Sequence, residues 1–244
     1  MKIRTVSKEE VRGELARKES GVILTLFERS MLPHNESIYK NSAGGVSLFQ
    51  SYIRGREDLD RMFGRYTDPR ERSLFPKSMD NHAVVIRKVD YGEAVEGVNK
   101  KKEILEMYLL RILPQICKPG DDATQEGSCI EKDKDCLDRI SARVHYGDFV
   151  ALAKLHEKPA LFVPMIKAGA WADIRFALRD EKQEAAVVER VAKKCLLLEL
   201  DQTLGTTISS IWNRDIMPIT LDDEVDFFKL HRKEIVAQFG SVTG

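Results

Sequence analysis

Two cations, Arg143 and Lys154, lie in one predicted helical stretch, RISARVHYGDFVALAK, which runs from residue 139 to residue 154. They are eleven residues apart, or about three turns at ~3.6 residues per turn, so their side chains share a face of the helix. A long cation over an apolar face can pack its stem and extend its charge into water. Two cations turned toward the interior of a helical bundle would instead form an anion site. Spacing alone favours the first interpretation.

Two further pairs have helical spacing. Asp180 and Glu184 are four residues apart, and so are Thr220 and Glu224, so each pair shares a helix face. Each also has a local explanation. The sequence DEKQE is typical of a charged helix start, where acids favour the helix dipole. Thr220 could be the N-cap of the last helix, with Asp223 at the capping-box position.

Other residues whose types occur in active sites are explained more simply by surface ion pairing or by packing. Arg12 is three residues after Glu9 in the first predicted helix, a spacing typical of a surface ion pair. Four aromatic or histidine side chains are assigned to packing: His145, Tyr146, Trp171 and Trp212. His145 and Tyr146 are assigned to packing because they lie off the helix face that carries Arg143 and Lys154.

Composition excludes several functional classes. Basic and acidic residues number 39 each, so the net charge is near zero, which argues against nucleic acid or an anionic membrane as the main partner. No apolar run approaches the ~20 residues that span a bilayer. The N-terminal segment lacks the apolar core of a signal peptide, so we expect a cytoplasmic protein. A secreted protein whose signal peptide has been removed is the alternative.

The four cysteines have no C-x-x-C pair or histidine cluster at zinc-site spacing, so no metal is expected. We expect reduced thiols, most of them in the core. A Cys117–Cys129 disulfide closing the polar loop between them is the alternative, and it would indicate an oxidising compartment.

The hydrophobic pattern predicts helices and no strand of any length. A capping box at Ser7–Glu10 opens a helix through about residue 29. Further helices are expected at 46–63, 99–116, 131–156, after Pro159, after Gly169, and at 181–198, 208–216 and 221–239, with a turn at 199–205 and Pro218 separating the last two. The irregular segment 65–97 is long enough to suggest a functional loop. We therefore expect an all-α, single-domain helical bundle over residues 1–244.

The motif R-x-H-[FY]-G-x-[FV]-V-A-x-A-K, at Arg143 to Lys154, resembles the active-site helix of the AroQ-class chorismate mutases of fungi and plants. Four more fragments match that family in the same order: Val11–Leu15, Phe27–Ser30, Gly120–Ser128 and Pro218–Glu224. Together they cover about residues 8–235. The resemblance implies an all-α homodimer that rearranges chorismate to prephenate without a cofactor.

The resemblance also implies a role for each matched residue. Arg12 and Arg143 would hold the two substrate carboxylates, and Lys154 would donate to the ether oxygen. Asp180 and Glu184 would contact the hydroxyl side, Thr220 would line the site, and Glu224 would face the ether oxygen as a neutral acid. This unimolecular [3,3] rearrangement needs neither nucleophile, metal nor redox group. It needs positioning and electrostatic stabilisation.

Fungal members of the family bind tyrosine or tryptophan at a dimer interface, and that site is only partly matched. Gly127 and Ser128 are present, but an arginine pair is reduced to Arg65, which follows Gly64. We therefore expect weakened effector control, as would suit an enzyme freed from feedback, such as one exported by a fungus. The alternative function is an inactive helical interaction protein that kept the fold. Segment 65–97 is the candidate site for a protein partner.

Overall fold

The computed structural model describes residues 7–42, 45–66, 72–75 and 97–240. Most of the predicted partner-binding segment 65–97 therefore lies outside the described residues. Within the described ranges the chain is all-α, as predicted, and its only strand-like feature is an isolated bridge between Pro33 and Lys118. No helix in those ranges is long and apolar enough to cross a membrane.

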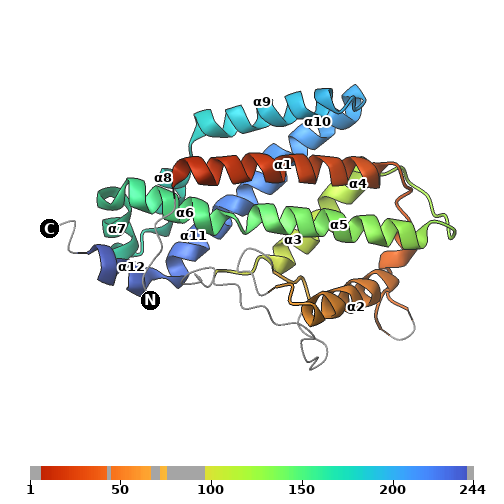
Figure 1. The fold of residues 1–244 in the computed structure, drawn as a ribbon, viewed down its shortest axis with the longest axis horizontal. Coiled ribbons are helices and arrows are strands. Elements are labelled where there is room, and N and C mark those ends of the chain that lie inside the picture. The colour runs from red at the N-terminus through yellow and green to blue at the C-terminus, as the bar shows by residue number, and fades with distance from the viewer. Residues whose placement is uncertain (1–6, 43–44, 67–71, 76–96, 241–244) are drawn as a thin grey trace.

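Two long helices, α1 (Lys8–Ser30) and α5 (Glu126–Val144), lie side by side along the molecule (Figure 1). The predicted start of α1 is confirmed, because the Ser7 hydroxyl accepts a hydrogen bond from the Glu10 amide at 3.1 Å. A 3₁₀ turn, η1 (Glu36–Tyr39), leads to α2 (Leu48–Met62), which Ser47 caps in the same way. The second helix, predicted at 46–63, therefore begins two residues later than expected.

Two prolines follow π turns instead of ending helices. The first rod comprises α3 (Lys101–Met107), the π turn η2 (Tyr108–Ile112) and α4 (Leu113–Ile116). The second comprises α10 (Gln202–Ile211), η3 (Trp212–Ile216) and α11 (Met217–Leu230). Pro114 and Pro218 each come two residues after the π turn. A proline cannot donate to the helical ladder, and the wider π turn just before it adjusts the backbone.

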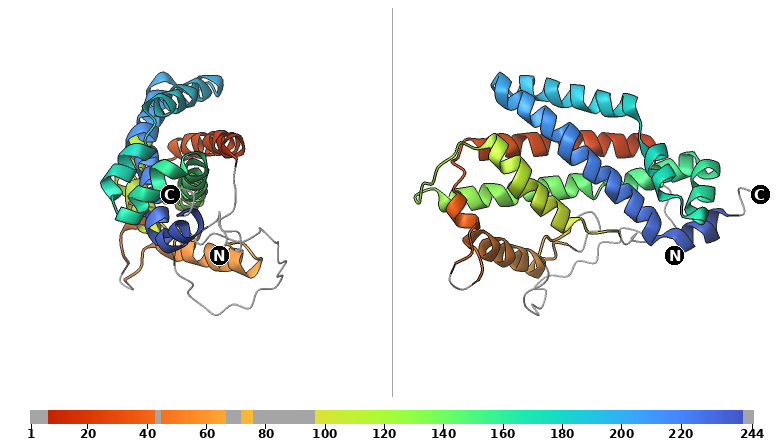
Figure 2. Two further views of the ribbon diagram at one scale, coloured as in Figure 1. Left: turned by 90° about the vertical axis from the view of Figure 1, so that its left-hand side faces the viewer. Right: turned by 180° about the vertical axis from the view of Figure 1, so that it is seen from behind.

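The prediction that Pro218 separates two helices is therefore wrong: α10, η3 and α11 form one long diagonal rod (Figure 2). The predicted turn at 199–205 is also too long. Asp201 caps α10 by accepting hydrogen bonds from the amides of Thr203 and Leu204, so the helix begins at Gln202. A break does occur at His231, where α11 ends and α12 (Arg232–Phe239) begins, so the helix predicted at 221–239 is divided there.

The predicted continuous helix 131–156 is broken as well. It starts earlier, as α5, and a turn at residues 145–146 separates α5 from α6 (Gly147–Glu157). The buried His145 holds this turn, because its Nε2 accepts from the Lys100 amide at 2.9 Å and its Nδ1 pairs with the Ser141 hydroxyl at 3.1 Å. The packing assignment of His145 is thus confirmed, and the residue also joins α5 to the segment before α3.

Two short helices, α7 (Pro159–Ala168) and α8 (Trp171–Leu178), follow α6 and lead to the longer α9 (Glu181–Leu197). Gly169 ends α7 with φ 75°, a conformation that glycine adopts without strain.

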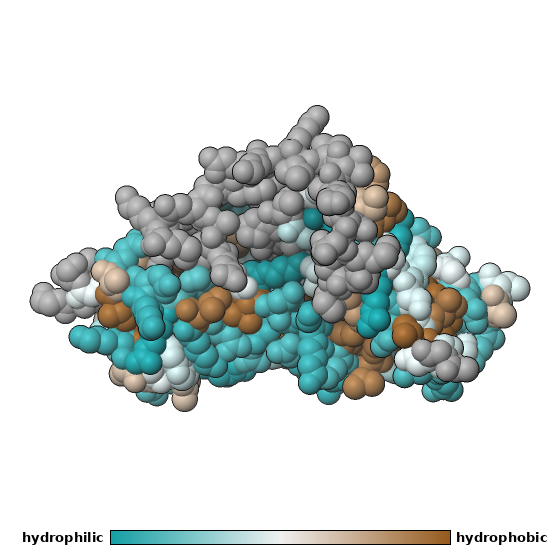
Figure 3. Space-filling view, turned by 90° about the horizontal axis from the view of Figure 1, so that it is seen from below, coloured by the Kyte–Doolittle hydropathy of each residue, from teal (hydrophilic) through white to brown (hydrophobic). Residues whose placement is uncertain are grey.

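The larger apolar cluster draws on α1, α2, the rod from α3 to α4, α5, α9, α10 and η3, where Trp212 is fully buried. A second cluster joins α6, α7, α8, α11 and α12. The packing assignments of Tyr146, Trp171 and Trp212 are confirmed. On the face shown in Figure 3, the visible described residues are mainly hydrophilic, and apolar side chains gather in separate small groups.

All four cysteines are buried free thiols. The alternative of a Cys117–Cys129 disulfide is therefore wrong. The two thiols have different polar neighbours: Arg29 donates to the Cys117 sulfur at 3.2 Å, and Asn35 donates to the Cys129 sulfur at 3.1 Å. Burial raises the pKa of Cys117 to about 12, so the thiol stays protonated.

Candidate active site

Lys154 and Glu224 form the best-defined contact of the site. The Lys154 ammonium, from the last turns of α6, donates to Glu224 Oε2 at 2.8 Å and to the Leu178 carbonyl at 2.7 Å. Glu224 projects from α11 and its side chain is only 7% exposed, whereas that of Lys154 is 27% exposed. Three helices, α6, α8 and α11, therefore fix the lysine beside a buried carboxyl group.

Arg143 supplies a second cation from the last turn of α5. The residue is 5% exposed, and its guanidinium lies 5.9 Å from the Trp212 ring centroid. Its Nη1 donates to the Thr220 hydroxyl at a long 3.4 Å, and that hydroxyl itself donates to the Ile216 carbonyl at 2.8 Å. The Nε of Arg143 has no hydrogen-bond partner among the described residues. A buried guanidinium with underused donors is suited to bind an anion.

These positions decide two of the open interpretations. Arg143 is turned inward, so the interpretation that its charge extends into water is wrong. Thr220 lies inside α11 and does not cap a helix, so the N-cap interpretation is wrong too. The kink after α5 does not separate the two cations, because Arg143 and Lys154 both act on the charge of Glu224.

Burial and charge set the protonation of these groups. Burial lowers the pKa of Arg143 to about 10, against the opposing effect of Glu19 and Glu224, so it remains a cation at neutral pH. Burial raises the pKa of Glu224; Lys154 and Arg143 oppose this shift, and the charge of Glu184 adds to it. The site therefore combines the cationic guanidinium of Arg143 with a carboxyl group whose raised pKa favours its neutral form.

Asp180 and Glu184 occupy the start of α9, as the sequence predicts. The local interpretation of this stretch as a charged helix start is confirmed, and the Asp180 carboxylate also caps the helix by accepting from the Gln183 amide at 3.0 Å. Glu184 accepts from Arg179 at 3.3 Å, and its charge also acts on Glu224. Glu184 is thus electrostatically linked to the buried centre, whereas Asp180 is tied to its own helix.

Arg12 is exposed on the first turns of α1. Its Nη2 donates to the Gln183 side chain on α9 at 3.4 Å, and no ion pair with Glu9 occurs among the described residues. The surface-pair interpretation is therefore wrong. Arg12 reaches toward the helix that carries Glu184, at the outer edge of the site.

Sequence reasoning missed Glu19, a fully buried carboxylate next to Arg143. It accepts from Arg190 at 2.8 and 2.5 Å and from Lys194 at 3.1 Å, which joins α1 to α9. Burial raises the pKa of Glu19, but Arg190 and Lys194 outweigh it and the net pKa is lowered. A signal existed, because Glu19 shares a helix face with Val22, Ile23 and Leu26 of the core.

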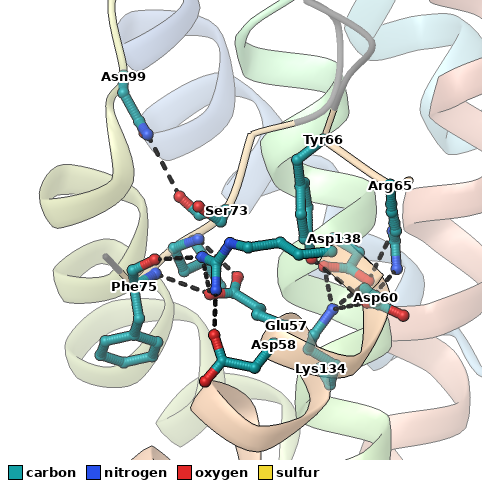
Figure 4. A network of polar contacts seen from close by, with 12 residues as sticks. Glu57, Asp58, Asp60, Arg65, Tyr66, Ser73, Phe75, Asn99, Lys134 and Asp138 are labelled. Atoms are coloured by element: carbon teal, nitrogen blue, oxygen red, sulfur yellow. Dashed lines mark hydrogen bonds and ion pairs between the residues drawn. The ribbon is translucent and has the colours of Figure 1, made fainter. Parts of the chain in front are cut away.

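The partly matched regulatory residues do not meet within this chain. Arg65 pairs with Asp60 and with Asp138 of α5, at 2.9 Å each (Figure 4). Gly127 and Ser128 are exposed in the first turn of α5, ten residues and about 15 Å of helix away from Asp138. Gly64 has φ 82°, so an arginine at that position would be strained. The backbone thus gives a physical reason for the missing arginine.

No family model matches the chain. Curated relatives are similar over most of its length. A chorismate mutase of Emericella nidulans is 33% identical over 242 residues, covering 89% of each chain. One of Schizosaccharomyces pombe is 30% identical over 238 residues, covering 90% of this chain and 94% of the relative.

Solved structures agree with these relatives. The chloroplast chorismate mutase of Zea mays matches with a TM-score of 0.85 and 28% identity, covering 94% of this chain and 96% of that one. A chorismate mutase of Candida albicans in complex with L-Trp has a TM-score of 0.85 at 24% identity, covering 93% and 92% of the two chains.

Proposed function

The chain belongs to the chorismate mutase family, and we propose that Arg143, Lys154 and Glu224 form the centre of its substrate site. It is an enzyme that converts chorismate to prephenate, and the alternative of an inactive interaction protein is not supported. The observation that carries the site assignment is Arg143, a buried guanidinium whose Nε has no partner among the described residues.

The reaction suits such a site. Chorismate is a dianion with an enol ether, and the rearrangement breaks a C–O bond and forms a C–C bond within one molecule. Arg143 binds one carboxylate, with Thr220 orienting the guanidinium through their 3.4 Å hydrogen bond. Arg12 binds the second carboxylate from the edge of the site. Fixed donors near the developing charge stabilise the transition state without reorganisation.

Lys154 and Glu224 act on the ether oxygen, which gains negative charge as the C–O bond breaks. The ammonium of Lys154 is one donor. Glu224 is a donor only when neutral, and its raised pKa favours that form. Glu184 and Asp180 lie toward the hydroxyl side of the substrate. Because Asp180 already accepts the Gln183 amide, its contribution is the smaller of the two.

The direct test is to incubate the purified protein with chorismate and to follow the loss of chorismate absorbance and the appearance of prephenate. Conversion in a chelator-containing buffer is expected, because the assigned residues supply the required charges themselves. A folded protein that leaves chorismate unchanged would contradict the function.

The assembly and control of the enzyme are also proposals. We propose a homodimer in which effector control is weak, since Arg65 is engaged by Asp60 and Asp138 and Gly64 replaces its neighbour. We further propose that residues 1–244 form one domain and that the enzyme is cytoplasmic, with export as the alternative. Sedimentation analysis tests the dimer, and secretion into culture medium by the source cells tests export.

A further inference from the structure

A second pair of buried carboxyl groups lies next to the site. Asp148 is in the first turn of α6 and is 3% exposed, and Asp223 is on α11 and is fully buried. The two helices approach closely here: a Cβ added to Gly147 would lie 2.8 Å from Asp223 Oδ2 and 2.9 Å from the Thr220 carbonyl. None of the roles assigned above to substrate binding or catalysis uses this pair.

The pair lacks hydrogen-bond donors. Asp148 Oδ2 accepts from Arg72, but Asp148 Oδ1 and both oxygens of Asp223 have no donor among the described residues. Ionised carboxylates only accept hydrogen bonds, so a proton between them is what allows one to donate to the other. Burial, together with the charge of Asp148, raises the pKa of Asp223 to about 9. Burial raises the pKa of Asp148 as well, and the charge and hydrogen bond of Arg72 oppose that shift.

The other charged groups around the pair come from four places in the fold. They are Arg72 and Lys100 before α3, His145 at the end of α5, Glu224 on α11 and His231 after α11. Burial lowers the pKa of His145 to about 3, so this ring stays neutral in the range where Asp223 titrates. The cations favour one ionised carboxylate, and the nearby Glu224 disfavours a second.

Arg72 is held in place by its own segment. It also donates to the Val98 carbonyl. Next to it, the amides of Leu74 and Phe75 donate to the buried Glu57 of α2, at 2.6 and 2.9 Å (Figure 4). Asp148 thus faces a cation whose segment is anchored to α2, whereas Asp223 on α11 has no donor among the described residues.

We propose that Asp148 and Asp223 share one proton and act as positioning residues, which hold α6 against α11 and so set the distance between Lys154 and Glu224. Asp148 lies six residues before Lys154 on α6, and Asp223 directly precedes Glu224 on α11. Loss of the shared proton places two buried negative charges in contact and drives these helices apart. The inference rests on the proposed roles of Lys154 and Glu224.

The first test measures kcat and KM for chorismate across pH 6–10 in the Glu224→Gln background, which removes the other titrating carboxyl group. In Glu224→Gln we expect kcat still to fall as the pH rises. This fall should be absent in Glu224→Gln/Asp223→Asn, because the asparagine amide donates a hydrogen bond at every pH. Asp222→Asn is the matched control: Asp222 adjoins Asp223 but pairs with Arg175 at the surface, and the fall should persist. An unchanged fall in Glu224→Gln/Asp223→Asn would overturn the proposal.

The second test does not depend on the reaction. Because the folded pKa of Asp223 is raised from 3.8 to about 9, the folded state holds about one extra proton between these values, so its contribution to stability is lost as pH rises toward 9. The unfolding free energy of Asp223→Asn should therefore fall less steeply with pH than that of the wild type. If this variant does not fold, Asp148→Asn should show the same flattening. Parallel pH dependences would refute the shared proton even if the enzyme is active.

Discussion

At the scale of single residues, the site combines groups that are ordinary in type and unusual in placement. A guanidinium that is removed from water and keeps unused donors costs free energy unless an anion satisfies it. Arg143 is such a group, and its neighbours Thr220 and Trp212 hold it without neutralising it. The structure therefore maintains an electrostatic cost at the position that we propose for a carboxylate of the substrate.

Glu224→Gln should keep substantial activity and reduce the alkaline decline of the rate. The folded pKa of Glu224 is raised, so the donor form is present at low pH and is lost as pH rises through that pKa. Glutamine remains a donor at every pH. A pH–rate profile of both proteins checks this, with the later fall assigned to the Asp148–Asp223 pair remaining in the variant. Superimposable profiles would remove Glu224 from the mechanism.

Lys154→Ala should lower kcat on the order of 10²–10³-fold, which is typical for loss of one preorganised donor. Arg12→Ala should have a smaller effect, mainly on KM, because Arg12 is exposed and its 3.4 Å contact with Gln183 is weak. Steady-state kinetics of the two variants test this order. A larger loss for Arg12 would mean that the arginine turns inward when substrate binds.

At the scale of elements, α6 and α11 must lie unusually close for Lys154 to reach Glu224. Gly147→Ala would place a Cβ against the Thr220 carbonyl and the Asp223 carboxyl group. We expect it to destabilise the fold by about 1–3 kcal/mol, as overpacking typically does, and to lower activity.

Gly13→Ala is the control for this substitution, since a Cβ at Gly13 meets nothing within 4 Å and the residue lies inside α1. It should be neutral or stabilising by about 0.4–1 kcal/mol. Chemical denaturation of both variants gives the comparison. Equal unfolding free energies for Gly147→Ala and Gly13→Ala would show that the close approach of α6 to α11 does not limit the size of residue 147.

The sequence predicted most elements because local signals dominate there: Ser7 and Ser47 cap α1 and α2, and the apolar spacing marks their buried faces. It failed where a tertiary contact decides. The kink after α5 depends on His145 meeting the Lys100 amide, 45 residues away, and the rod through Pro218 depends on a π turn. Asp148 and Asp223 carry no sequence signal of being partners, since only the packing of α6 on α11 brings them together.

The site residues were found by resemblance more than by spacing. Spacing alone favoured a solvated Arg143 and allowed Thr220 to be an N-cap. Both interpretations were wrong, because side-chain burial depends on neighbouring helices that no local pattern specifies. The assigned roles of the seven matched residues in binding and catalysis remain predictions, and substitutions at these positions test them.

At the scale of the whole molecule, we expect tyrosine and tryptophan to change the initial rate little at sub-millimolar concentration. An effector shifts a conformational equilibrium only by its differential affinity for the two states. Here Arg65 is held by two carboxylates, and Gly64 has a backbone conformation unsuited to a second arginine. Titrating each amino acid against initial rates tests this. A several-fold change in rate would show that other residues complete the effector site.

We propose that this fold catalyses the rearrangement of chorismate through the buried guanidinium of Arg143. The most direct test compares initial rates of chorismate loss for the wild type, Arg143→Ala and Arg139→Ala, each checked for folding by circular dichroism. Arg139 is an exposed arginine one turn earlier on α5, so its loss controls for charge and helix propensity. We predict a loss on the order of 10²–10³-fold for Arg143→Ala and near wild-type turnover for Arg139→Ala. Near-normal turnover in a folded Arg143→Ala protein would contradict the account.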